Sequence, residues 1–152
     1  ILLMRQGDMV AAEEMLRKIL AIDPGYDTGH YSIGNLYYKI GKLGKAIDHY
    51  QKALRYRPDY VNAFINLGNI YRDTGDVTKA AYLYQEALKV DSNAVEALNN
   101  LGILFAQKGD MIKALGLFER AVRLNPDDRE IRKNYDSAKS HLTKQNLYGP
   151  FR

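Results

Sequence analysis

The stretch "NLGNIYRDTGD", residues 66–76, has a close relative 34 residues later, "NLGILFAQKGD" at residues 100–110. A third copy, "SIGNLYYKIGK", occupies residues 32–42, which is the same interval in the other direction. Similar segments at a fixed spacing predict a repeat architecture, in which each copy is one supersecondary unit that packs against its neighbours.

The middle copy is typical of a helical hairpin. Phe64, Leu67 and Tyr71 are spaced by three and four residues, which places them on one face of a helix. Gly75 is predicted to end this helix, because glycine readily adopts the left-handed conformation of a helix C-terminus. Asp76 follows as a residue that can cap the next helix. The apolar face of that second helix carries Ala80, Tyr84, Ala87 and Leu88.

A glycine also lies inside the first helix of each copy, at Gly34, Gly68 and Gly102. A glycine within a helix costs about 1 kcal/mol relative to alanine, so its recurrence at one phase indicates a structural need. We expect it to allow close contact between the two helices of a hairpin. The expected small partners on the second helix are Ala46, Ala80 and Ala114, with the repeated aromatic residues filling wider gaps in the core.

This pattern resembles the tetratricopeptide repeat (TPR), a 34-residue helix-turn-helix unit. The family's eight signature positions are filled in the third copy by Leu98, Leu101, Gly102, Phe105, Ala114, Phe118, Ala121 and Pro126. The first copy departs only at His30, where a large apolar residue is usual, and the second only at Ser92, where proline is usual. The resemblance implies an all-α fold, a right-handed α-solenoid of stacked hairpins with a C-terminal capping helix.

The repeat register extends beyond the three full copies. We predict one array over residues 1–145, with a truncated repeat at 1–26, full repeats at 27–60, 61–94 and 95–128, and a capping helix at 129–145. Helices are expected near 9–22, 27–40, 43–56, 61–74, 77–90, 95–108, 111–124 and 129–145, with errors of about two to four residues at each end. The chain starts at Ile1, so we expect it to be part of a longer protein.

The last seven residues, "NLYGPFR" at 146–152, fall outside the repeat pattern. Gly149 and Pro150 should stop a helix, and Tyr148 and Phe151 have no core position. We expect this tail to dock on a repeat surface of its own or a neighbouring chain. The alternative is a chain end that is ordered only by contacts between molecules.

The sequence holds no pattern typical of a catalytic or metal site. The histidines His30, His49 and His141 are far apart in the chain, and none has a second ligand at metal-binding spacing. "GKLGK" at residues 41–45 lacks the spacing of a phosphate-binding loop and should be a turn between helices. Cysteine is absent, which excludes disulfides and thiolate chemistry. We therefore expect no catalytic residue, no metal, no cofactor and no enzymatic activity.

Composition also limits the classes of partner that the chain is expected to bind. The net charge is +4, but the cations are scattered among acids along the second helices, whereas nucleic-acid binding needs a clustered basic surface. No apolar run approaches the ~18 residues that a membrane span requires. We expect a protein or peptide partner, no nucleic acid, no membrane contact from this chain, and a possible homo-oligomer through the repeat ends or the tail.

Stacked hairpins of this kind curve, and the first helix of each unit lines the concave surface. The resemblance places repeat positions 2, 5, 6, 9, 12 and 13 in this groove. The candidate peptide-binding residues there are Tyr31, Asn35, Tyr38, Asn62, Asn66, Asn69, Arg72, Asn99, Asn100 and Asn134. The charges along the groove cancel, with Lys39, Arg72 and Lys133 against Asp73, Glu96 and Glu130.

Asparagines at one repeat position, Asn66, Asn100 and Asn134, form a ladder along the groove. A carboxamide both donates and accepts hydrogen bonds, so such a ladder suits the backbone of an extended peptide. The other interpretation is structural, with each asparagine tying neighbouring helices together. The sequence leaves both interpretations open.

Family members that bind chaperone C-termini hold the terminal carboxylate with a Lys-Asn-Asn-Lys-Arg set. This sequence matches the two asparagines, at Asn35 and Asn66, but has Tyr31, Glu96 and Asn100 where the cations belong. Without those cations a carboxylate clamp is not expected.

The resemblance thus implies a non-catalytic scaffold that binds an extended peptide or partner segment in an Asn- and Tyr-lined groove. Two alternatives stay open. One is a self-assembly module that joins copies through open repeat ends, and the other is a regulatory TPR domain of a larger enzyme.

Overall fold

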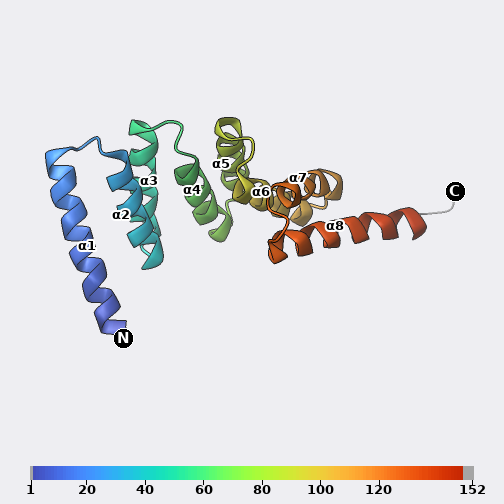
Figure 1. Ribbon diagram of the computed structural model, residues 1–152, viewed down its shortest axis with the longest axis horizontal. Helices are drawn as coiled ribbons and strands as arrows, with labels where there is room; N and C mark the ends of the chain where they lie inside the picture. The colour runs from blue at the N-terminus through green and yellow to red at the C-terminus, as the bar shows by residue number, and fades with distance from the viewer. Residues whose placement is uncertain (1, 149–152) are drawn as a thin grey trace.

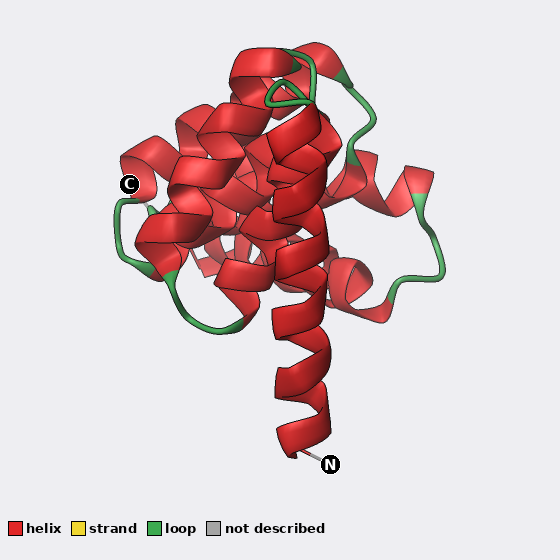
Figure 2. Cartoon of the chain, turned by 90° about the vertical axis from the view of Figure 1, so that its left-hand side faces the viewer, coloured by secondary structure: helices red, strands yellow, loops and turns green. Residues whose placement is uncertain are grey.

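The chain is described by a computed structural model that covers the backbone of residues 2–148 and the side chains of residues 9–144. This part is entirely helical, with no strand (Figures 1 and 2). The helices are α1 (Leu2–Ile22), α2 (Asp27–Lys39), α3 (Leu43–Tyr56), α4 (Val61–Asp73), α5 (Val77–Val90), α6 (Val95–Gln107), α7 (Met111–Leu124) and α8 (Arg129–Tyr148).

The predicted helix ends agree closely with the observed ones inside the array. Every end from Ile22 to Arg129 lies within one residue of its predicted position. The predicted start of the first helix near residue 9 is wrong, because α1 already begins at Leu2. The last helix, α8, continues past 145 to Tyr148, which lies within the expected error. The first three residues of the predicted tail are therefore helical, and the remaining residues, on which the docking prediction depends, lie outside the described range.

The turn within each hairpin depends on a glycine. Gly41, Gly75 and Gly109 have φ angles of 73°, 88° and 84°, in the left-handed region that side chains other than glycine rarely adopt. Asp76 and Asp110 then cap α5 and α7, since their carboxylates accept from the backbone N–H of the residue three positions on. The predicted glycine stop and aspartate cap are confirmed, and "GKLGK" is a turn between helices.

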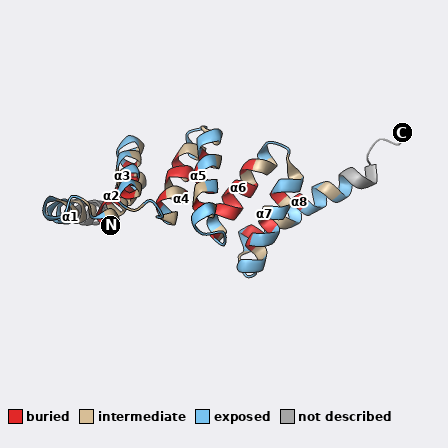
Figure 3. Cartoon of the chain, turned by 90° about the horizontal axis from the view of Figure 1, so that it is seen from above, coloured by how far each residue is buried: buried red, intermediate tan, exposed pale blue. Residues whose placement is uncertain are grey.

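The helices pair as α2 with α3, α4 with α5 and α6 with α7, and the pairs follow one another along a row that ends in α8 (Figure 1). Buried residues concentrate on the facing sides of these pairs, whereas α8 is covered mainly by exposed and half-buried residues (Figure 3). The cap packs on the array through apolar residues, since Ile131 and Ala138 of α8 are buried against α6 and α7.

The glycines inside α2, α4 and α6 do make room, but not for the alanines that the sequence suggested. A Cβ atom on Gly68 would lie 2.7 Å from the ring of Tyr84, and the same is true of Gly34 with Tyr50 and Gly102 with Phe118. The expectation of an alanine partner is wrong in this respect, although those alanines are fully buried elsewhere in the core. The aromatic ring of the second helix lies directly against the backbone of the first.

Gly68→Leu should lower the free energy of unfolding by about 1–3 kcal/mol, the usual cost of overpacking. The leucine must displace the fully buried Tyr84 ring, whose hydroxyl is also hydrogen-bonded to Asn69. Urea unfolding followed by circular dichroism measures the change.

Gly116→Ala is the matched control. Gly116 lies inside α7, and a Cβ atom added to it would meet nothing within 4 Å, so alanine should stabilise the protein by about 0.5–1 kcal/mol. A Gly68→Leu protein that unfolds at the same urea concentration as the parent would show that the ring contact is looser than described.

The histidines are not all separate, contrary to the sequence-based expectation. His30 and His49 belong to the same hairpin, and their Nδ1 atoms lie 3.2 Å apart. Both replace apolar residues, because the equivalent positions hold Phe64 and Leu83 in the second full repeat. The pair therefore occupies a site that is hydrophobic in the other copies.

The surroundings of the pair fix its neutral tautomers. His30 Nε2 lies 3.1 Å from the carbonyl oxygen of Pro24, which can only accept, so this nitrogen carries the proton. His30 Nδ1 then accepts from the Nδ1–H of His49. Burial, and after it the proximity of His30, lower the pKa of the His49 imidazole, with Lys52, Asp48 and Arg17 as the other charged neighbours.

This arrangement predicts a loss of stability in mild acid. Because the folded-state pKa of His49 is lowered, its contribution is complete above the unfolded-state pKa of about 6.5 and is lost as the pH falls from there toward the folded value. Unfolding free energies should therefore drop between about pH 7.5 and about pH 5.5, well above the range near 4 in which carboxylates titrate.

His30→Phe with His49→Leu, which copies the second repeat, should remove most of this drop. Urea unfolding at the two pH values compares the variant with the parent. Equal pH dependence in both proteins would show that the histidine pair does not carry the effect.

Candidate functional site

Two neighbouring repeats are joined by a short relay of polar side chains. The Tyr50 hydroxyl, which comes from α3, donates to Asn35 Oδ1 on α2 at 2.7 Å. Asn66, on α4 of the next repeat, donates to the same oxygen at 2.9 Å. Asn35 thus accepts one hydrogen bond from its own hairpin and one from the following hairpin.

The relay recurs one repeat later. Tyr84 donates to Asn69 Oδ1 at 2.7 Å, and Asn100 Nδ2 donates to the same oxygen at 2.9 Å. Burial raises the pKa of the Tyr84 phenol to about 12 and also raises that of Tyr50. Both hydroxyls therefore stay protonated at neutral pH and remain donors.

The third repeat lacks the relay. Ile103 replaces the accepting asparagine, and Phe118 replaces the tyrosine, so neither the acceptor nor the hydroxyl is present. Asn134 on α8 instead donates to Asn99 Oδ1 at 3.0 Å. A tyrosine at position 118 would have no asparagine at position 103 to accept its hydroxyl, whereas Phe118 leaves no polar group unpaired there.

All three ladder asparagines use their amide nitrogen in a bond to the preceding repeat. Among the described residues, no hydrogen bond uses the side-chain carbonyl oxygen of Asn66, Asn100 or Asn134 as its acceptor. The structural interpretation of the ladder therefore holds for its nitrogens, and its oxygens remain as acceptors.

The two tyrosines predicted for ligand contact also have structural partners. Tyr31 packs against the rings of Tyr50 and Tyr60, with centroids 5.8 and 4.7 Å away. Tyr38 donates to Asp73 Oδ2 at 2.9 Å. Tyr31 and Tyr38 therefore contribute to the structure itself, and both remain partly exposed.

The remaining candidates lie on α4 and α6. Arg72 forms an ion pair with Asp73, and Asn69 Nδ2 donates to Glu96 Oε1 at 3.2 Å. Asn62 is exposed, and Asn99 is buried with 8% of its surface accessible. The structure thus connects Tyr31, Asn35 and Asn66 directly, and Asn69 with Asn100, but gives Asn62 no partner among the hydrogen bonds described.

Two cavities open between α6 and α8. One has a volume of about 430 Å³ and is lined by Val95, Glu96, Asn99, Asn100, Asn125, Asp128, Glu130 and Ile131. The other, the α6–α8 pocket, has a volume of about 400 Å³ and is lined by Ile103, Ala106, Gln107, Met111, Phe118, Asn134, Ser137, Ala138, Ser140, His141 and Lys144. Both are lined in part by residues that the sequence placed in the groove.

Other kinds of site find no support in the part of the chain that the structure describes. Within it, no three His, Asp or Glu side chains come together in a way that could hold a metal ion. Its helices are also too short or too polar to cross a bilayer.

The fold and this surface define a helical-repeat protein. The sequence matches the TPR repeat family over residues 34–71 and 68–109, and the tetratricopeptide repeat over residues 95–128. The chain belongs to the TPR family, whose repeats are typically non-catalytic interaction modules. No curated protein shows significant similarity to it in sequence.

Solved structures support the same fold. One is the first TPR of Spaghetti (RPAP3) bound to the HSP90 peptide SRMEEVD, with a TM-score of 0.72 and 21% identity, over 77% of this chain and 93% of that one. Another is the Arabidopsis OM64 TPR domain, with a TM-score of 0.70 and 18% identity, over 76% of this chain and 95% of that one. A protein-interaction scaffold is the function class that these findings support.

Sequence reasoning missed the tyrosine hydroxyls and the α6–α8 pocket. The signal for the relay was present, since Tyr50 and Tyr84 accompany Asn35 and Asn69, and Phe118 accompanies Ile103. The sequence predicts only that these tyrosines pack in the core. It does not show which group the hydroxyl at the end of each ring contacts.

Proposed function

We propose that the chain is a non-catalytic scaffold that binds an extended segment of a partner protein along the face formed by α2, α4, α6 and α8. The observation that carries this proposal is the orientation of the ladder asparagines. Their amide nitrogens are bonded to the preceding repeat, so their carbonyl oxygens are held in place as acceptors.

The spacing of these acceptors suits an extended backbone. Packed helices lie about 8–10 Å apart, and an extended chain advances about 3.3 Å per residue. Successive acceptors, one per repeat, are therefore a few ligand residues apart. They meet those N–H groups that face the ladder, since N–H groups point to alternate sides along an extended chain. Because N–H groups are common to all residues except proline, the ladder contributes affinity with little dependence on ligand sequence.

The charges of the central groove argue against binding of a terminal carboxylate there. Glu96 stands where a clamp would need a cation, and it accepts from Asn69. Arg72 is the cation of α4, and it is paired with Asp73. The proposal is therefore recognition of an internal extended segment, and not of a free C-terminus.

Asn66→Ala together with Asn100→Ala should weaken ligand binding by roughly tenfold or more, since two acceptors are lost at a cost of about 1 kcal/mol each. The probe is a peptide selected from a phage-displayed library of random sequences on the wild-type protein, and fluorescence anisotropy measures its dissociation constant.

Tyr84→Phe is the matched control, because it removes a relay hydroxyl without touching a ladder oxygen. It should cost about 1 kcal/mol of stability and leave the affinity unchanged, as Phe118 already occupies this position in the third repeat. Circular dichroism checks the fold of each variant. An unchanged affinity in the folded double variant would contradict the groove proposal.

Self-association is a second candidate, favoured by the surface of α1. Met15 and Ile19 are 66% and 38% exposed, and Ile22 is 87% exposed on the same side of the helix. Ile19 occupies the repeat position at which Ala53 and Ala87 are fully buried. The face that a first helix covers in the complete hairpins is thus open in α1, and exposed apolar stripes of this kind favour association.

Static light scattering tests this candidate. If α1 joins copies, the apparent mass should rise above 17.3 kDa with concentration, and Met15→Glu with Ile19→Glu should abolish the rise. Ile112→Glu, at an exposed position on α7, should not. A constant monomer mass at every concentration would rule out self-association of this chain.

A further inference from the structure

The inner face of the solenoid changes along its length at one repeat position. Tyr38 and Arg72 occupy this position in the first two full repeats, and Ala106 and Ser140 occupy it in the third repeat and the cap. The two large side chains are held in place by Asp73, to which both are hydrogen-bonded. Space that is filled between α2 and α4 is therefore open between α6 and α8.

The α6–α8 pocket occupies this space and has an apolar floor. Ile103 and Phe118 stand where the earlier repeats have the asparagine and tyrosine of the relay, and Met111 and Ala138 extend the apolar surface. The rim is polar, with Gln107, Asn134, Ser137 and Ser140. An apolar floor with a few polar groups around it is typical of a binding pocket.

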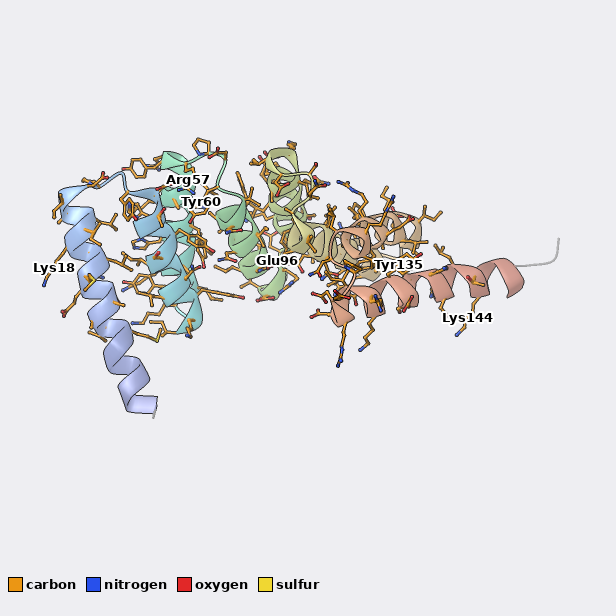
Figure 4. The ribbon with its side chains drawn as sticks, in the orientation of Figure 1. Lys18, Arg57, Tyr60, Glu96, Tyr135 and Lys144 are labelled. Atoms are coloured by element: carbon orange, nitrogen blue, oxygen red, sulfur yellow. The ribbon has the colours of Figure 1, made fainter. Side chains whose placement is uncertain are left out.

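The charge of the pocket is also one-sided. Lys144 lines it, and among the residues whose side chains are described no carboxylate does. Lys144 extends away from the ribbon of α8 (Figure 4), and Lys133 lies on the same face three turns earlier, since the spacing 133, 137, 140, 144 follows the helix period. Lys133 and Lys144 take part in none of the ion pairs found within residues 9–144.

We propose that the α6–α8 pocket holds one large apolar side chain of the partner segment, and that Asp or Glu residues next to it meet Lys144 and Lys133. This inference rests on the proposed function and adds to it the sequence class of the ligand. The volume of about 400 Å³ lies at the small end of the range for ligand pockets and leaves room for one aromatic or long aliphatic side chain. The positive rim complements carboxylates, which charge-assisted hydrogen bonds recognise.

Asn134 connects the pocket with the ladder. Its nitrogen donates to Asn99, so its carbonyl oxygen at the rim can accept the backbone N–H of the residue whose side chain fills the pocket. The ladder then positions the backbone of the ligand, and the α6–α8 pocket selects which ligand residue lies beside Asn134.

A phage-displayed library of random dodecapeptides, selected on the wild-type protein, tests this directly. We expect enriched sequences to share one large apolar residue with an acidic residue within two positions of it. In a synthetic peptide of this kind, replacing the apolar residue with alanine should weaken binding by roughly tenfold or more, as for a buried anchor at an interface.

Two variants, each with a matched control, test whether the peptide binds in the α6–α8 pocket. Ala106→Tyr, which copies Tyr38, should fill the space and weaken binding by roughly tenfold, while Gln85→Tyr on the exposed side of α5 should not. Lys144→Glu should weaken the acidic peptide by roughly three- to tenfold, whereas Lys139→Glu, with the same charge change on the outer face of α8, should have little effect. Methyl NMR signals of Ile103, Ala106 and Met111 should shift on titration.

The outcomes separate the two levels of the proposal. If no peptide is enriched, the proposed function fails and this inference fails with it. If peptides bind but show no apolar or acidic preference, or bind Ala106→Tyr as tightly as the parent, the pocket assignment is wrong and groove binding stands. Enrichment of basic residues beside the apolar one would overturn the charge assignment.

Discussion

The contact between a glycine of the first helix and an aromatic ring of the second helix is the constraint on which each hairpin depends. In the second full repeat the Tyr84 ring lies so close to Gly68 that a single Cβ atom would collide with it. The ring is therefore fixed against the backbone and is fully buried. Because the ring is fixed, its hydroxyl reaches a fixed point, which is the carbonyl oxygen of Asn69. The packing contact within one hairpin thus positions Asn69, whose carbonyl oxygen also accepts the hydrogen bond from Asn100 of the next hairpin.

The third repeat has the same packing contact but lacks the hydrogen bond between a tyrosine and an asparagine. Phe118 lies against Gly102 as closely as the tyrosines lie against their glycines, but it has no hydroxyl. The position of the accepting asparagine becomes Ile103, and Asn134 donates to Asn99 instead. The same two substitutions supply the apolar floor of the α6–α8 pocket. The fold tolerates this change because the glycine contact, and not the hydroxyl, holds the hairpin together.

The helix ends could be predicted from the sequence because they depend on local chemistry. Gly75 and Asp76 specify a turn and a cap in adjacent residues, and the apolar spacing specifies a helix within two turns. The partner of Gly68 could not be predicted in the same way, since it depends on how two helices are rotated against each other. A helix presents both Ala80 and Tyr84 to the same side, and only the packed structure shows which of them meets the glycine.

For the candidate binding groove too, the sequence predicted the positions of the residues but not the contacts that they make. The ladder of Asn66, Asn100 and Asn134 followed from the repeat interval, whereas the direction of each amide depends on acceptors from another repeat. The histidine pair does not show in the spacing along the chain, because His30 and His49 lie on different helices 19 residues apart. Phe64 and Leu83 are apolar at the same two positions, and a paired replacement of this kind indicates contact.

The structural and binding roles of the ladder asparagines do not exclude each other, because they use different atoms. When the carbonyl oxygen of an amide accepts a hydrogen bond, its N–H groups become better donors, so bonds at the two ends reinforce one another. A ligand that bonds to Asn66 and Asn100 would therefore strengthen the bonds that join their repeats to the preceding ones. In a solenoid, stability is approximately the sum of the repeats and of the interfaces between neighbours. The proposed ligand acts on those interfaces, so its binding and the rigidity of the array should rise together.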